Sequence, residues 1–386
     1  MSAAAPDQTG EPRRVHVALV AGGGAVKAYA YHLGVIRGLE EDGFSFGSGL
    51  RWEPRLPPPG VRGVDTYVGS SAGACVVSSV ASGHTVDTLV GALTGDASVP
   101  RFGYHTLFVP VAPNPLRYLA RLVRRARISD LRPRHLIEVG GILTTAGVEK
   151  YFRRHALITN RFSDLAVGLY IAATQVNGAR KVVFGPRDSL GEEGYDRECA
   201  YYDNVPISQA VAAAVSIPPV FAPYAITNPT SGKRFHYYDG EVRETLSVHV
   251  ARDAGADFVI ASSIWRPYSY DDQVGTIADL GMVTLAEQAL HQAVGQKVDR
   301  DREQADAFAR VLDVIEAHGR THALPREATL ALQAEVCRVL QHRPVPTLYV
   351  TPVESDHDFF FASSFRFGRA VVERCFEAGR RAYQAA

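Results

Sequence analysis

Two stretches decide the fold: VHVALVAGGGAVKA, residues 15–28, and DTYVGSSAGA, residues 65–74. Each is an apolar run that reaches glycine and continues into small residues, which is the pattern of a strand that turns into a helix. The sequence Gly-Xaa-Ser-Xaa-Gly places a hydroxyl on a sharp, exposed turn, because the glycines leave room for the backbone to fold tightly. Ser71 carries that hydroxyl and is the predicted nucleophile.

A run of three glycines, Gly22, Gly23 and Gly24, stands at the start of the first predicted helix. The first N–H groups of a helix have no partner within the helix, so this run can present several donors to one oxyanion. A nucleotide-binding loop is the rival hypothesis. It is disfavoured because Lys27 stands where a dinucleotide loop needs its third glycine, and no Gly-Lys-Ser/Thr sequence marks a P-loop.

The composition limits the class of protein. Of the 386 residues, 46% are hydrophobic, and 41 basic side chains balance 41 acidic ones, so no overall field attracts nucleic acid. The four cysteines lack the spacing of zinc ligands, and we expect neither a metal nor a cofactor. We expect a cytoplasmic protein, because the N-terminus lacks the apolar core of a signal peptide and no stretch approaches the ~20 apolar residues of a membrane span.

Predicted strands and helices alternate along the chain. This order predicts an α/β protein with three layers, helices on both faces of a mostly parallel central sheet. We expect a single domain over residues 15–386, preceded by a disordered arm over residues 1–14. Residues 43–63 contain PRLPPPG and little periodicity, so we predict a surface loop there.

Two regions differ from this pattern. Residues 96–162 form a predicted cap or insertion that is rich in arginine, and residues 277–341 are predicted to be mainly helical. In the first region Arg117, Arg121, Arg124 and Arg125 alternate with leucines, as in a basic amphipathic helix. Such a helix can contact an anionic membrane surface, or it can expose arginines above a packed leucine stripe; the sequence leaves both hypotheses open.

A serine hydroxyl needs a base to accept its proton. Asp239 ends the predicted strand FHYYD and precedes a glycine, and burial there would raise the pKa of its carboxyl and make it a stronger base. The alternative is a conventional triad in the chain order serine, acid, histidine, with Asp356 and His357 as partners. These two residues lie in the loop-like ESDHDFFF, with no strand before them to fix their position.

Taken together and in this order, GGGAVKA, GSSAG and YYDG resemble the patatin-like phospholipases, serine acyl hydrolases that use a Ser–Asp dyad. The resemblance covers about residues 15–95 and 167–263. It implies a patatin-like fold, a lipid ester substrate and phospholipase A or lysophospholipase activity without a cofactor. By the same likeness Ser71 is the nucleophile, Asp239 the general base, and the backbone of Gly22 to Gly24 the oxyanion hole.

Two positions depart from the family pattern. Ala28 follows Lys27 where the family usually has glycine, and Glu241 takes the third place of a motif that normally reads Asp-Gly-Gly or Asp-Gly-Ala. We expect Glu241 to raise the pKa of the base or to narrow substrate entry, and Lys27 to orient the glycine loop or contact an anionic head group. These departures also suggest a second hypothesis, a catalytically inactive member that binds lipid or a partner.

Overall fold

The computed structural model describes residues 15–58, 60–96, 100–111, 141–178, 181–186, 199–228, 232–272, 274–340 and 343–386. Residues 1–14, the predicted arm, lie outside this part of the chain. Arg117, Arg121, Arg124 and Arg125 lie outside it as well, so the membrane contact of these arginines stays a prediction.

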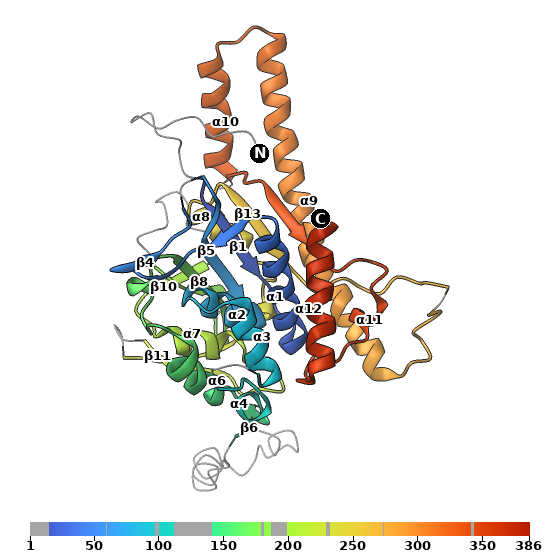
Figure 1. Ribbon diagram of the computed structural model, residues 1–386. Helices are drawn as coiled ribbons and strands as arrows, with labels where there is room; N and C mark the ends of the chain where they lie inside the picture. The colour runs from blue at the N-terminus through green and yellow to red at the C-terminus, as the bar shows by residue number, and fades with distance from the viewer. Residues whose placement is uncertain are drawn as a thin grey trace, which may run out of the picture.

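The core of the molecule is a mostly parallel sheet (Figure 1). Five strands run parallel in the spatial order β8-β5-β1-β13-β14: β8 (Gly168–Gln175), β5 (Arg62–Ser70), β1 (Val17–Ala21), β13 (Phe258–Ser262) and β14 (Thr347–Val350). The predicted hairpin after residue 175 pairs β8 with β9 (Lys181–Phe184), and β10 (Cys199–Tyr202) lies parallel to β9. A second predicted hairpin, β11 (Tyr224–Thr227) with β12 (Arg234–Asp239), pairs with β8 in the antiparallel direction.

Helices cover both faces of the sheet. On β1, Val17, Leu19 and Ala21 belong to the core that includes α1 (Ala25–Glu41), α2 (Ala72–Ala81), α7 (Ile207–Ala214) and α12 (Arg369–Gln384). The alternate residues Ala18 and Val20 pack with α8 (Val248–Asp253) on the other face. A parallel strand buried on both faces needs such a continuous apolar run. The predicted three-layer α/β/α fold is therefore confirmed.

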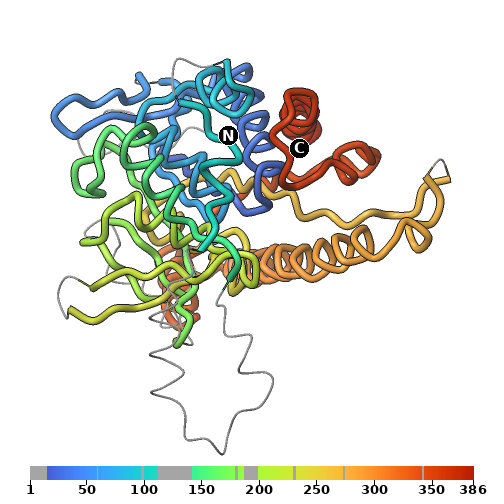
Figure 2. Tube along the Cα trace, turned by 90° about the horizontal axis from the view of Figure 1, so that it is seen from below, coloured from blue at the N-terminus to red at the C-terminus, as the bar shows by residue number. Residues whose placement is uncertain are grey.

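The helices α1 and α12 lie side by side although they stand at opposite ends of the chain (Figure 2). Two glycines allow this close approach. A Cβ atom added at Gly34 would lie 1.8 Å from the carbonyl oxygen of Phe376, and one added at Gly379 would lie 2.0 Å from that of Tyr31. Backbone atoms cannot rotate away as a side chain can, so only glycine fits at these contacts.

We expect Gly34→Ala to lower the free energy of unfolding by about 1–3 kcal/mol, because the added methyl forces the two helices apart. Urea denaturation measures this change. Gly368→Ala is the matched control, since a Cβ atom there meets nothing within 4 Å. Equal denaturation midpoints for the two variants would contradict the packing argument.

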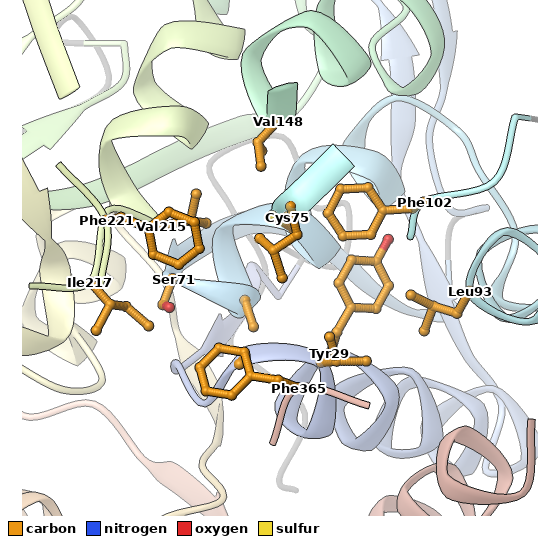
Figure 3. A pocket seen from close by; sticks show the side chains of 14 residues that line it. Tyr29, Ser71, Cys75, Leu93, Phe102, Val148, Val215, Ile217, Phe221 and Phe365 are labelled. Carbon is orange, nitrogen blue, oxygen red and sulfur yellow. The ribbon is translucent and has the colours of Figure 1, made fainter. Parts of the chain in front are cut away.

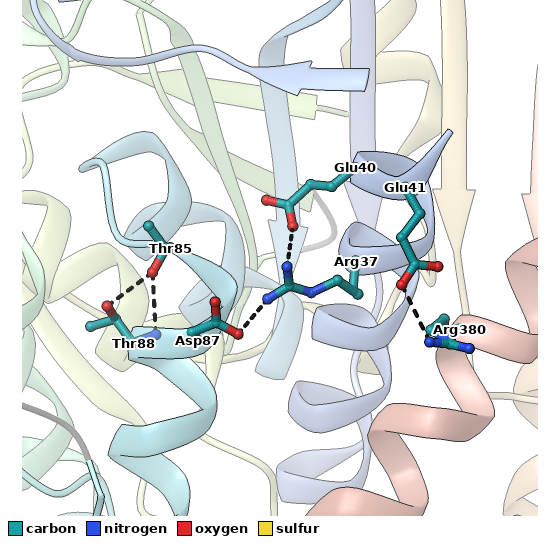
Figure 4. Close-up of polar contacts among 7 residues, drawn as sticks. All are labelled: Arg37, Glu40, Glu41, Thr85, Asp87, Thr88 and Arg380. Carbon is teal, nitrogen blue, oxygen red and sulfur yellow. Dashed lines mark hydrogen bonds and ion pairs between the residues drawn. The ribbon is translucent and has the colours of Figure 1, made fainter. Parts of the chain in front are cut away.

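Polar contacts at the surface also connect these helices (Figure 4). Arg37 on α1 pairs with Asp87 on α3 (Val86–Thr94), and Glu41 accepts a hydrogen bond from Arg380 on α12 at 3.3 Å. Exposed ion pairs of this kind typically contribute about 0–1 kcal/mol each. The apolar contacts beneath them therefore hold α1 in place.

The C-terminal region is helical, as predicted. The long helix α9 (Met282–Thr321) and the antiparallel α10 (Arg326–Leu340) form a hairpin whose tip projects away from the sheet (Figure 1). Val294 and Val298, in the first half of α9, are buried against the body of the protein. Among the described helices, none combines the length and the apolar character that a bilayer span requires.

The prediction of a loop over residues 43–63 is wrong. β2 (Phe44–Phe46) pairs in parallel with β5, and β3 (Ser48–Leu50) forms a short hairpin with β4 (Glu53–Arg55). Strands of three residues are too short for a periodic pattern, and β2 is fixed by the neighbouring edge of β5 rather than by its own sequence.

The described parts of the predicted insertion hold short elements that pack beside α7. They are α4 (Tyr104–Leu107), β6 (Val109–Pro110), β7 (Leu143–Thr144), α6 (Ala146–Tyr151), the π-helical turn η3 (Phe152–Ala156) and, just after it, the 3₁₀ turn η4 (Phe162–Asp164). Their apolar side chains border the cavity described below.

Candidate active site

Ser71 lies at the turn between β5 and α2, where the sequence predicts a nucleophile. Its φ angle of 51° is the left-handed conformation typical of a strained elbow. Two positions on, a Cβ atom at Gly73 would lie 2.0 Å from the carbonyl oxygen of Ala21. The N–H of Gly73 also donates to the carbonyl of Gly22 at 3.0 Å. The two glycine motifs are thus in direct contact.

Asp239 ends β12 and is only 1% exposed. Its Oδ1 accepts the N–H of Glu241 at 2.9 Å, while the buried Oδ2 has no partner at standard hydrogen-bond geometry among the described residues. In the sheet, Asp239 pairs with Ala173 of β8 and Ser70 pairs with the adjacent Ala172, so the turn at Ser71 lies beside this carboxyl. Hydrogen bonding from the Ser71 side chain lowers the pKa of Asp239. Catalytic hydrogen bonds are often long before substrate binds. Burial is the larger effect and raises the pKa of Asp239 to about 8.

The three glycines have different environments. The N–H of Gly22 donates to the carbonyl of Ser262 at 3.0 Å, and the N–H of Gly23 donates to Oε1 of Glu241 at 2.8 Å. Gly24, with a φ of 133°, precedes α1, and its N–H has no hydrogen-bond partner in the described part of the chain. The N–H of Gly22 is thus bound to sheet backbone, whereas that of Gly23 is held by a side chain, which can move, so Gly23 and Gly24 are the candidate oxyanion donors.

An apolar cavity begins at Ser71 (Figure 3). Ile217 and Phe221 lie near Ser71 at one end, and Leu93 and Phe102 lie at the other, with Cys75 between them. The surface of this cavity is almost entirely carbon. Such a lining suits the hydrocarbon chain of a substrate.

A family model described as patatin-like phospholipase matches residues 19–252, more than half of the chain. The chain belongs to the patatin-like phospholipase family. Membership of this family supports a general activity, the hydrolysis of acyl groups from lipids. No curated protein matches the chain. Among solved structures, VipD from Legionella pneumophila aligns over 99% of this chain and 69% of its own, with 12% identity and a TM-score of 0.35.

His32 supports the glycine loop of this patatin-like site. Its Nε2 donates to the carbonyl of Gly22 at 2.9 Å, and its Nδ1 contacts the hydroxyl of Ser262 at 2.7 Å. Burial lowers the pKa of His32 to about 4, so the ring is neutral at pH 7. No motif surrounds His32 in the sequence, and only the tertiary structure brings it to Gly22.

Lys27 is 2% exposed, a position that favours its predicted role beside the glycine loop over contact with a lipid head group. Its ammonium donates to the carbonyl of Phe360 at 2.8 Å and lies 4.7 Å from the ring centre of Phe359, both on α11 (His357–Phe360). Burial lowers the pKa of Lys27 to about 8. Lys27 thus connects the helix that follows the glycine loop to α11.

The conventional triad has no support in this structure. His357 pairs with Asp271 at 3.5 Å, and Asp356 accepts a hydrogen bond from Arg381 at 2.6 Å. Neither residue lines the cavity at Ser71. Asp356 caps α11 and His357 begins it, and this helix lies next to α12, on the far side of α1 from α2 (Figure 1).

Glu241 has a larger part in the patatin-like site than the sequence indicates. Besides Gly23, its carboxylate accepts hydrogen bonds from the hydroxyl of Ser70 and from Nε1 of Trp265, the latter at 3.0 Å. The sequence identifies Glu241 as unusual because of its place in the motif. It contains no signal for Trp265, which lies 24 positions later in the chain.

Proposed function

We propose that this patatin-like protein is a lipid acyl hydrolase of the phospholipase A or lysophospholipase type, with Ser71 as nucleophile and Asp239 as general base. The supporting observation is the sheet register, which sets the buried Asp239 carboxyl at the end of β12 beside the turn that carries Ser71, next to an apolar cavity. A buried carboxylate is a stronger base than a solvated one, which suits it to accept the proton of an alcohol.

In the first half of the reaction, Ser71 Oγ forms a bond to the carbonyl carbon of the ester while Asp239 accepts the hydroxyl proton. The tetrahedral intermediate collapses, the ester C–O bond breaks, and Asp239 returns the proton to the departing alcohol. In the second half, water attacks the acyl-enzyme and gives a proton to Asp239. The second tetrahedral intermediate collapses, the bond between the acyl carbon and Ser71 Oγ breaks, and Asp239 returns the proton to Oγ, which restores the hydroxyl and releases the carboxylic acid.

The negatively charged oxygen of each tetrahedral intermediate needs hydrogen-bond donors. In this proposal the N–H groups of Gly23 and Gly24 supply them, at the start of α1 where the helix favours negative charge. Loss of one such donor typically costs about 3–4 kcal/mol in barrier height. Glu241 holds the donor of Gly23 in this structure.

The apolar cavity supports the proposal that the protein recognises the acyl chain of its substrate. Each buried methylene is worth about 0.8 kcal/mol, which corresponds to roughly a fourfold gain in kcat/KM. Among nitrophenyl esters we therefore expect kcat/KM to rise with chain length until the cavity is full. Leu93 lies at the end away from Ser71 (Figure 3).

We expect Leu93→Phe to reduce kcat/KM for octanoate about fourfold relative to acetate, because the larger side chain occupies the space of about one methylene. Kinetics with the ester series measures this ratio. Leu330→Phe, the same change at an exposed site on α10, is the control. An unchanged octanoate-to-acetate ratio in Leu93→Phe would mean that the chain binds elsewhere.

The proposed function as a whole is tested with a fluorophosphonate probe and a phospholipid substrate. The expected result is a covalent adduct on Ser71, located by mass spectrometry, together with release of fatty acid. Folded protein that acquires no adduct and releases no fatty acid would favour the inactive, lipid-binding alternative.

A further inference from the structure

The side chain of Glu241 lies directly against the glycine loop. Its Oε1 accepts the N–H of Gly23 at 2.8 Å. A Cβ atom added at Gly23 would lie 2.5 Å from Cγ of Glu241 and 2.7 Å from Cβ of Ser71. Gly23 is thus enclosed between the nucleophile and this carboxyl group. The Glu241 carboxylate occupies the donor that the intermediate of the proposed reaction needs.

We propose that Glu241 is an internal anion on the oxyanion donor of Gly23, and that the site stabilises a tetrahedral intermediate only when this carboxylate has released Gly23 or gained a proton. The inference rests on the proposed function. One N–H group cannot fully serve two anions, and two negative oxygens beside the same donor repel each other in a buried site. Removal of the Glu241 carboxylate therefore frees the donor.

The groups around Glu241 hold it in this position. Ser70 at the end of β5 and Trp265 after β13 donate to its carboxylate. Lys297 on α9 donates to the backbone carbonyls of Glu241 and Val242, each at 3.3 Å. The turn η5 (Gly240–Val242) is thus held from three directions. α9 lies beyond the part of the chain that the family model matches.

The effect of the charge on Glu241 depends on the titratable groups that face it. Asp239 on β12 lies two residues away, and the charge of Glu241 raises the pKa of Asp239. Burial lowers the pKa values of His32 on α1 and His291 on α9 to about 4, so neither is charged at pH 7. His291 packs edge-to-face against Trp265. Burial raises the pKa of Cys75 on α2, which stays a neutral thiol. Among these groups, Lys297 carries the positive charge.

Burial raises the pKa of Glu241 itself, while hydrogen bonds from Ser70, Gly23, Thr245 and Trp265 lower it. A charged Glu241 consequently opposes the reaction in two ways. It occupies the donor of Gly23, and it keeps a proton on the base Asp239. Replacement by glycine relieves both effects, whereas glutamine removes the charge but keeps an amide oxygen that can still accept the N–H of Gly23. In both variants the base loses its proton at lower pH.

The experiment compares wild-type protein with Glu241→Gly, which restores the usual family motif, and Glu241→Gln, which keeps the size and removes the charge. The rate of fluorophosphonate labelling and kcat/KM for a short nitrophenyl ester are measured from pH 5 to 10. We expect both rates at pH 7 to rise about 10- to 100-fold in Glu241→Gly, within the effect of one oxyanion donor, and to rise less in Glu241→Gln, whose amide oxygen can still accept the N–H of Gly23. We also expect the acid limb of the pH profile to move to lower pH. Glu335→Gln, the same change at an exposed site on α10, controls for the substitution.

Each outcome decides the proposal. Faster labelling with a shifted acid limb in either folded variant supports it, including the case in which wild-type protein labels very slowly. If wild-type protein labels at Ser71 and the Glu241 variants label no faster with an unchanged pH profile, Glu241 is a packing residue and the proposal is overturned while the proposed function stands. If no variant labels, the proposed function fails and the inference fails with it. Should Glu241→Gly not fold, Glu241→Ala gives the decision, because the family motif also reads Asp-Gly-Ala and alanine has no oxygen to hold Gly23.

Discussion

Ser71→Ala protein is expected to lose esterase activity by about 10⁴-fold or more in kcat, as when a catalytic serine is removed from other hydrolases. The reason is specific to this turn. The positive φ of Ser71 directs its hydroxyl to the start of the cavity, and α2 after it is buried throughout. No neighbouring side chain can take the same position. The loss is measured as the rate of nitrophenyl ester hydrolysis and the absence of a fluorophosphonate adduct.

Ser79→Ala provides the control for this prediction. Ser79 is also a buried serine of α2, but its hydroxyl donates to the carbonyl of Cys75 within the same helix at 2.9 Å. This variant should keep wild-type labelling and a similar melting temperature. Undiminished hydrolysis in folded Ser71→Ala protein would remove Ser71 from the mechanism altogether.

The second large effect is expected for Asp239→Asn, which should lower kcat by about 10³–10⁴-fold. Asparagine keeps an oxygen that can accept the N–H of Glu241, so the turn after β12 retains its hydrogen bond. It cannot accept the proton of Ser71. The variant should therefore fold like the wild type and fail in the chemical step, so that kcat falls much more than KM changes.

The pH dependence of the wild-type enzyme follows from the same carboxyl group. Burial raises the pKa of Asp239 to about 8, and the base acts only when ionised. Below that pKa the proton is bound and kcat/KM should fall about tenfold per pH unit; above it the rate should level off. Asp239→Asn should lose this limb.

His357→Ala separates the dyad from a conventional triad. Because His357 pairs with Asp271 on the far side of α1, we expect this variant to retain its activity and its acid limb. A large loss of kcat in His357→Ala, together with an active Asp239→Asn variant, would contradict the assignment of the base.

The local sequence was sufficient to predict much of the fold. The apolar runs before Gly22 and Gly69, the alternating strands and helices, and the hairpin at Asn177-Gly178 each carry their signal within a few residues. The three-residue strands over residues 44–55 could not be found in this way, because their pairing depends on β5 and on each other.

For the candidate site, the sequence determined which groups can react and in what local geometry. These groups are a serine between glycines after a strand, a carboxyl group at the end of a strand, and a run of glycines at the start of a helix. These are properties of short segments, and backbone sterics enforce them wherever the segment lies. Only the tertiary structure decided which groups meet. Parallel pairing of β1, β5 and β8, with β12 beside β8, brings residues 23, 71 and 239 together at one end of the strands. The same assembly buries Lys27 and turns Glu241 onto Gly23, since burial and long-range hydrogen bonds depend on segments hundreds of residues apart.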